Sequence, residues 1–95
     1  MASYFDSRKT VTEERVRAVT ELVFDKLKRR IAEKGSGSFV HRHEIMGCVQ
    51  EEYHELVQAS HNRDLIHMTW ELEDLAVAAI FSIASIELGI DNSER

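Results

Sequence analysis

The chain has 95 residues, 43% hydrophobic and 31% charged, which is the composition of one globular domain (residues 1–95) and excludes a disordered or collagen-like chain. The absence of proline and the presence of only four glycines disfavour a many-stranded β protein and predict an all-α fold. The net charge of −5 disfavours a binder of nucleic-acid polymers, whose surface is usually dominated by basic residues.

Charge is distributed unevenly along the sequence. Residues 1–34 contain nine Lys or Arg and six acids, whereas residues 35–95 contain three and eleven. The acidic part is expected to attract cations, and the basic part is expected to meet an anion that those cations help to hold.

Cysteine content and the lengths of the apolar stretches bear on the compartment. Cys48 has no partner for an internal disulfide, which is typical of a reducing environment. The longest apolar stretch, residues 75–86, is interrupted by Ser82 and Ser85 and is too short to span a bilayer. The first nine residues lack the apolar core of a signal peptide. We therefore expect a cytoplasmic protein with no membrane role.

A first helix is predicted over residues 11–34. Thr10-x-x-Glu13 matches the capping-box pattern that begins many helices. Residues 35–38 form the only Gly/Ser cluster in the chain, which is a stop signal. Between these signals, apolar residues recur at intervals of three and four, as on the buried face of a helix: Val16, Val19, Val23, Leu27 and Ile31.

Two further helices complete the predicted fold. One covers residues 43–60 and the other residues 64–88, with Gly89 just past its end. The short connection between them predicts antiparallel neighbours, so the fold is expected to be an all-α bundle of three antiparallel helices. Residues 1–10 and 90–95 are expected to be flexible tails.

The third predicted helix indicates an oligomer. Residues 75–86 are apolar on nearly every side, as in a helix surrounded by others, and two companion helices are too few to surround it. We therefore expect a second copy of the chain to complete the bundle. Ala76, Ala79 and Ile83 are the candidates at or near that contact.

Two acidic doublets, Glu52-x-x-Glu55 and Glu71-x-x-Asp74, are the strongest functional signal. Residues three apart on a helix are separated by roughly 60° around its axis, so each doublet projects from one face. Both lie among apolar residues and at similar distances from the bend near Arg63. In an antiparallel pair of helices they are therefore expected to meet at the same height and to point inward.

Clustered, inward carboxylates repel one another and lose hydration, so they require a positive partner. Between Glu44 and Ile86 the only Lys or Arg is Arg63, so a bound cation is favoured. Carboxylate-rich oxygen ligation suits Mg²⁺, with Mn²⁺ as an alternative. One or two such ions would neutralise phosphate oxygens and activate water, with a carboxylate as general base.

Other interpretations of the acidic and histidine residues stay open at this point. An isolated Glu-x-x-Glu most often marks a solvated helix face. Five histidines with Cys48 suggest zinc but match no established spacing, and Glu51-x-x-His54 is half of a di-iron motif whose second half is missing. Glu51 and Glu73 adjoin the doublets but turn away from the apolar stripe, so we interpret them as solvated or supporting groups.

The segment Gln50-Glu-Glu-Tyr-His-Glu-Leu-Val-Gln-Ala59, followed by Glu71-Leu-Glu-Asp-Leu-Ala76, resembles MazG-like members of the all-α nucleoside triphosphate pyrophosphatase superfamily. The resemblance covers about residues 43–86. It implies a Mg²⁺-dependent hydrolase that splits a nucleoside triphosphate between its α and β phosphates, with a house-cleaning role as one expectation, and that forms homodimers or homotetramers. Its metal-binding and catalytic residues would be Glu52, Glu55, Glu71 and Asp74.

Contacts to the substrate are less clearly indicated. Relatives often carry a Lys or Asn beyond the second motif that contacts phosphate, and usually continue into another helix, whereas this chain offers Ser82, Ser85 and then Asn92. The alternative function is a non-catalytic helical interaction module that retains the fold. Candidate substrate residues near the glycine loop, the helix ends and the bend are Lys34, Phe39, Arg42, His43, Arg63 and Trp70.

Overall fold

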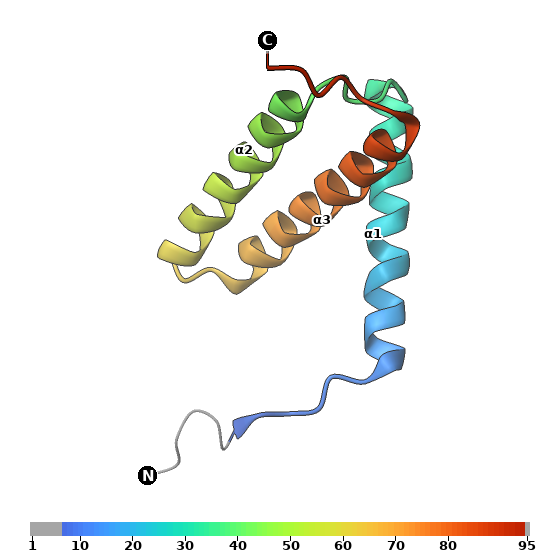
Figure 1. Ribbon diagram of the computed structural model, residues 1–95. Coiled ribbons are helices and arrows are strands. Elements are labelled where there is room, and N and C mark those ends of the chain that lie inside the picture. Colours follow the sequence, from blue (N-terminus) through green and yellow to red (C-terminus); the bar gives the residue numbers. More distant parts are fainter. Residues whose placement is uncertain (1–6, 95) are drawn as a thin grey trace.

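The computed structural model describes residues 7–94, and its architecture is three helices with no β-strand in this range (Figure 1). Helix α1 spans Glu13–Lys34, α2 spans Arg42–His61 and α3 spans Leu65–Leu88. The predicted all-α, three-helix bundle is therefore confirmed. None of these helices is long and apolar enough to cross a membrane.

The start of α1 differs from the prediction. Thr12 is the N-cap, and its Oγ1 accepts a hydrogen bond from the backbone N–H of Arg15 at 3.1 Å. The predicted capping box at Thr10 is wrong because the cap must directly precede the first helical residue, which is Glu13. At the other end, Gly35 adopts a φ of 92° and donates to the carbonyl of Ile31, so the glycine loop ends the helix as predicted.

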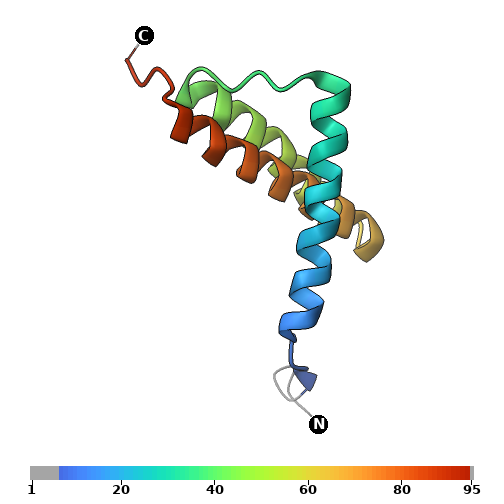
Figure 2. The ribbon, with the colours of Figure 1, turned by 90° about the vertical axis from the view of Figure 1, so that its right-hand side faces the viewer.

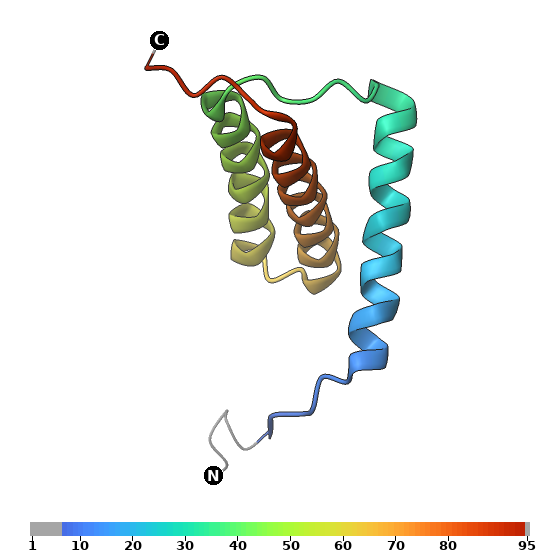
Figure 3. The ribbon, with the colours of Figure 1, turned by 45° about the vertical axis from the view of Figure 1, so that its right-hand side comes forward.

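Helices α2 and α3 form an antiparallel hairpin, as the short connection predicts (Figure 3). Arg63 in the bend has a φ of 59°, in the left-handed region, which lets three residues reverse the chain. Asp64 then caps α3, because its carboxylate accepts from the N–H of His67 at 3.0 Å. Gly89, with a φ of 92°, follows the last residue of α3.

Helix α1 crosses the hairpin and contacts it through α3 (Figure 2). The core of this contact is Val23 and Leu27 of α1 with Val77 of α3, surrounded by Ile31, Ala76 and Phe81.

The N-terminal half of α1 projects past the bend of the hairpin (Figures 1 and 3). Val16 and Val19 are 51% and 50% exposed, so the prediction that they belong to the buried stripe is wrong for the isolated chain. Their face is continuous with Val23 and Leu27, but α3 reaches only the later turns. This apolar surface is therefore uncovered.

The segment after α3 returns over the start of α2. The N–H of Asp91 donates to the carbonyl of Val40 at 2.8 Å, and Arg42 donates to the carbonyls of Asn92 and Ser93. Much of the C-terminal segment that was predicted to be a flexible tail is thus hydrogen-bonded to α2 and to the residues just before it. Residues 1–6 and 95 of the two predicted tails lie outside the described residues.

The position of the N-cap is testable by one substitution in α1. Thr12→Ala should lower the free energy of unfolding by about 1 kcal/mol, because the Arg15 amide loses its acceptor. Thr10→Ala is the control and should change it by less than about 0.5 kcal/mol, since Thr10 precedes the helix. Urea denaturation followed by circular dichroism measures both values. Equal losses in the two variants would contradict Thr12 as the cap.

Candidate metal centre

The hairpin brings the two acidic doublets together. Glu52 and Glu55 from α2 and Glu71 and Asp74 from α3 each offer one carboxylate oxygen, and these four oxygens all lie within 4.8 Å of one another. Glu71 is buried at 8% exposure, and the other three are half-buried. The i, i+3 spacing puts each pair on one face, and the antiparallel pairing brings those faces to the same level.

Two oxygens of this cluster lack any partner among the described residues. Glu52 Oε2 and Glu71 Oε2 are inaccessible to solvent and accept no hydrogen bond. Buried polar atoms in folded proteins are nearly always satisfied, and a charged oxygen loses more by isolation than a neutral one. These two oxygens are therefore available to accept a hydrogen bond or to coordinate a cation.

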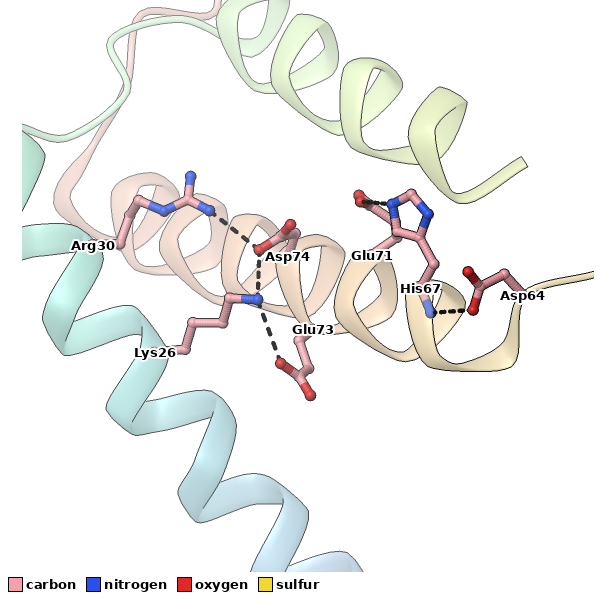
Figure 4. Close-up of polar contacts among 7 residues, drawn as sticks. All are labelled: Lys26, Arg30, Asp64, His67, Glu71, Glu73 and Asp74. Atoms are coloured by element: carbon pink, nitrogen blue, oxygen red, sulfur yellow. Dashed lines mark hydrogen bonds and ion pairs between the residues drawn. The ribbon is translucent and has the colours of Figure 1, made fainter. Parts of the chain in front are cut away.

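Helix α1 supplies cations that the sequence interpretation missed (Figure 4). Lys26 Nζ lies 2.9 Å from Asp74 Oδ1, and Arg30 Nη2 lies 3.2 Å from the same atom. These basic partners come from a different helix, outside the segment that contains the doublets. A signal was present, since Lys26 and Arg30 are one turn apart and alternate with the buried Val23 and Leu27.

Of its two predicted roles, solvated or supporting, Glu73 takes the supporting one. Its side chain is 18% exposed and lies 3.4 Å from Lys26 Nζ, on the side of α3 that faces α1 (Figure 4). Glu51, by contrast, is exposed. Lys26 is shared between Glu73 and Asp74. Lys26 and Arg30 together are therefore fewer than the carboxylates at the site.

The pKa values of two of these acids, Glu52 and Glu55, are raised. The pKa of Glu52 is raised by burial first and then by the negative charge of Asp74. The pKa of Glu55 is raised mainly because its carboxyl group lies within hydrogen-bonding reach of Glu71, and further by the charge of Glu52.

The pKa of Lys26, the cation beside the cluster, is also raised, which for a lysine favours the charged form. Burial acts to lower the pKa of Lys26, but hydrogen bonds and charge interactions with Asp74 and Glu73 outweigh it and raise the pKa. Lys26 is therefore firmly charged, and it offsets part of the repulsion on the α1 side of the cluster.

A cavity of about 270 Å³ borders the α1 side of the cluster. Glu52 and Asp74 form its acidic side, and the basic side chains of Arg30 and Lys34 line it as well. Phe39 and Phe81 close it in an edge-to-face arrangement, with ring centroids 5.3 Å apart. Acidic, basic and aromatic groups thus converge on one hollow beside the glycine loop.

The predicted substrate residues divide into two groups. Lys34 and Phe39 line this cavity, whereas the other four do not. Arg42 is occupied by the C-terminal segment, and Arg63 is exposed in the bend. His43 stacks against His41, and Trp70 is 57% exposed on α3. Three polar side chains that follow the second motif also form hydrogen bonds within the chain: Ser82, Ser85 and Asn92.

The opposite side of the cluster opens toward the hairpin bend. Glu55 and Glu71 line a second hollow there together with Gln58, His61 and His67. His67 Nε2 lies 3.1 Å from Glu71 Oε1 (Figure 4). The carboxylates therefore separate two hollows, and each hollow is bordered by one residue from each doublet.

Among residues 7–94, the four carboxylates are the one group of three or more His, Cys, Asp or Glu side chains placed to share an ion. Cys48 borders the cavity, and burial followed by the charge of Glu52 raises the pKa of its thiol, which disfavours the thiolate that zinc requires. An all-carboxylate set suits a hard cation such as Mg²⁺ or Mn²⁺.

Comparison of the sequence with protein-family models found no match, and neither did comparison with curated proteins or with solved structures. The family resemblance therefore stays a prediction from the two-doublet motif.

Repulsion within the cluster makes a prediction for Glu55. A raised pKa means that the folded protein holds more protons than the unfolded chain just above the ordinary glutamate pKa of about 4.3. In buffer with EDTA, this group therefore makes wild-type stability fall as pH rises through that range. Glu55→Gln is uncharged and can donate to Glu71, so it should become progressively more stable than wild type above about pH 4.3.

Urea denaturation of both proteins between about pH 4 and pH 8 measures the difference. Glu51→Gln, which removes an exposed neighbouring charge, is the matched control and should show a much smaller pH-dependent difference. A difference between wild type and Glu55→Gln that does not change with pH would contradict the repulsion.

Proposed function

We propose that this protein is a cytoplasmic, Mg²⁺-dependent nucleoside triphosphate pyrophosphohydrolase, which splits its substrate into a nucleoside monophosphate and pyrophosphate. The observation that carries the proposal is the convergence of four carboxylate oxygens within 4.8 Å beside a cavity with basic and aromatic walls. The Glu-x-x-Glu and Glu-x-x-Asp pattern, similar to that of MazG-like enzymes, supports the same reaction.

The residues fit the metal that the motif implies. Glu52, Glu55, Glu71 and Asp74 would hold it, since two of their buried oxygens lack any other partner and the cluster remains acidic despite Lys26 and Arg30. When bound, Mg²⁺ would supply charge neutralisation at the phosphate oxygens and favour ionisation of water.

The cavity offers complementary groups for a nucleotide. Arg30 and Lys34 are suited to phosphate oxygens, and they line the same hollow as Glu52 and Asp74. Phe39 and Phe81 offer aromatic surface for a base. Its volume of about 270 Å³ is slightly below the roughly 300–1,000 Å³ typical of ligand pockets, so part of a triphosphate would extend beyond it.

Glu55 is the carboxylate best suited to accept a proton from water. In the absence of a metal its pKa is raised by Glu71 and Glu52, and one of its oxygens lies within 4.8 Å of oxygens of Glu52 and Asp74, which border the proposed nucleotide cavity. In the proposed reaction, water attacks the α phosphorus, the bond to the oxygen that bridges to the β phosphorus breaks, and a proton from water passes to this carboxylate. Pyrophosphate leaves with the bridging oxygen.

Exposed apolar surface supports a homo-oligomer. On α3, Leu72, Ala79, Ile83 and Ile86 recur at helical spacing on a face that neither α1 nor α2 covers. A further hollow, lined by side chains that include Tyr53, Val57 and Leu72, continues this surface onto α2. A monomer rarely leaves so large a connected apolar area in water, so we propose that a second copy packs there.

A non-catalytic interaction module is the second candidate. The observation that favours it is the pairing of Asp74 with Lys26 and Arg30, which stabilises one carboxylate of the cluster without a metal. This candidate predicts that Mg²⁺ does not change the melting temperature. The enzyme predicts stabilisation by mass action, by about 2.7 kcal/mol at a Mg²⁺ concentration 100 times its Kd.

The decisive assay is pyrophosphate release from a panel of ribo- and deoxyribonucleoside triphosphates with Mg²⁺. Wild type should release pyrophosphate from at least one nucleotide, and Glu52→Gln should reduce the rate by about 100-fold or more because it removes a charged ligand. Glu51→Gln, an adjacent exposed glutamate, should retain activity. The absence of pyrophosphate release from every nucleotide would sink the enzyme proposal.

The oligomer predicts a separate result for the apolar face of α3. Ile83→Lys places a charge at a residue that is 58% exposed in the single chain, so it should dissociate the assembly without unfolding the helices. Ala32→Lys adds the same charge to the exposed face of α1 and should leave the assembly intact. Light scattering coupled to size-exclusion chromatography measures both masses. A wild-type protein that elutes as a monomer would contradict the interface.

A further inference from the structure

His67 is held in place from two directions. Its backbone N–H donates to the Asp64 carboxylate at 3.0 Å, which fixes the first turn of α3. Its ring reaches one turn along the helix, and Nε2 lies 3.1 Å from Glu71 Oε1 (Figure 4). The side chain of His67 is 46% exposed, whereas that of Glu71 is 11% exposed, so the ring lies at the border between the carboxylate cluster and solvent.

The direction of this hydrogen bond follows from the chemistry of its partners. A carboxylate that binds a metal is ionised and can only accept a hydrogen bond, so in the proposed metal site His67 donates from Nε2. Both the neutral tautomer with a proton on Nε2 and the fully protonated ring can do so, and the contact therefore does not depend on the charge of the histidine. Glu71 Oε1 is satisfied by this bond, while Oε2 is buried and has no partner among residues 7–94.

We propose that His67 is a positioning residue, which holds Glu71 by its Oε1 so that Oε2 remains directed at the carboxylate cluster as a metal ligand. The inference rests on the proposed metal site. A glutamate side chain has several rotatable bonds, and fixing one oxygen removes much of the freedom that metal binding would otherwise have to restrict. Hydrogen-bonded partners of metal ligands typically change metal affinity by about 10–100-fold when they are removed.

The competing role for His67 is purely structural. Residues four apart on a helix face each other, and a His–Glu pair of this kind can stabilise the first turns of α3 without affecting any ligand. Removal of the ring would then lower the stability of the protein in EDTA but leave Mg²⁺ affinity unchanged. Mg²⁺ affinity, measured on folded protein, therefore separates the two roles.

The test is titration calorimetry of the full chain with Mg²⁺ alone, for wild type, His67→Leu and His67→Gln. Leucine removes the donor and should weaken Mg²⁺ binding by about 10–100-fold. Glutamine carries an amide that can donate to Glu71, so its affinity should stay within about threefold of wild type, which also guards against a leucine variant that folds poorly. His61→Leu removes the other histidine of the same hollow and should leave affinity unchanged.

Each outcome bears on a different claim. If wild type binds Mg²⁺ and His67→Leu binds it equally well, the positioning role is wrong while the metal site stands. If glutamine weakens binding as much as leucine, the donated hydrogen bond is not the cause and the inference is overturned. If wild type binds no Mg²⁺, the metal site fails first and the role of His67 fails with it.

Discussion

The gathering of four buried or half-buried carboxylates between α2 and α3 is the constraint on which the rest of the structure depends. One oxygen of each lies within 4.8 Å of the others. Burial and then the charge of Asp74 raise the pKa of Glu52, whereas the close contact with Glu71 and then the charge of Glu52 raise the pKa of Glu55. The hairpin tolerates this because buried residues such as Ile45 and Ala59 of α2 and Ala78 of α3 maintain its packing. The site is therefore built at a free-energy cost that packing elsewhere offsets.

On the α1 side of the cluster, the contact between α1 and α3 provides both apolar packing and positive charge. The residues that bury α1 against α3, Val23 and Leu27, alternate along the helix with Lys26 and Arg30, which reach Asp74. Docking the apolar stripe therefore also delivers two cations to one edge of the cluster. Within residues 7–94, the opposite edge has the contact with His67, and Oε2 of Glu52 and Oε2 of Glu71 have no partner. This uneven compensation is what distinguishes the cluster from an ordinary network of salt bridges.

A single chain leaves much of its apolar surface exposed. The radius of gyration is 16.4 Å, whereas a compact domain of this length has about 12 Å. The projecting half of α1 and the outer face of the hairpin account for this surface, with Val16, Val19 and Ile83 each about half exposed or more. Because the carboxylates occupy the inner face of the hairpin, apolar residues of the outer face such as Ile83 are not covered by any other part of residues 7–94. The proposed second copy would bury them.

By itself, the sequence determined the three helices, the glycine stops and the pairing of Glu52-x-x-Glu55 with Glu71-x-x-Asp74, because periodicity, end signals and a short connection are properties of neighbouring residues. Only the tertiary structure decided which turns of the apolar face of α1 are covered and which cations reach the cluster. Arg30 and Asp74 are 44 residues apart, and no local rule specifies the angle and position at which α1 crosses α3. That crossing depends on how side chains from separate helices interlock, so it left Val16 and Val19 exposed while it brought Arg30 to the site.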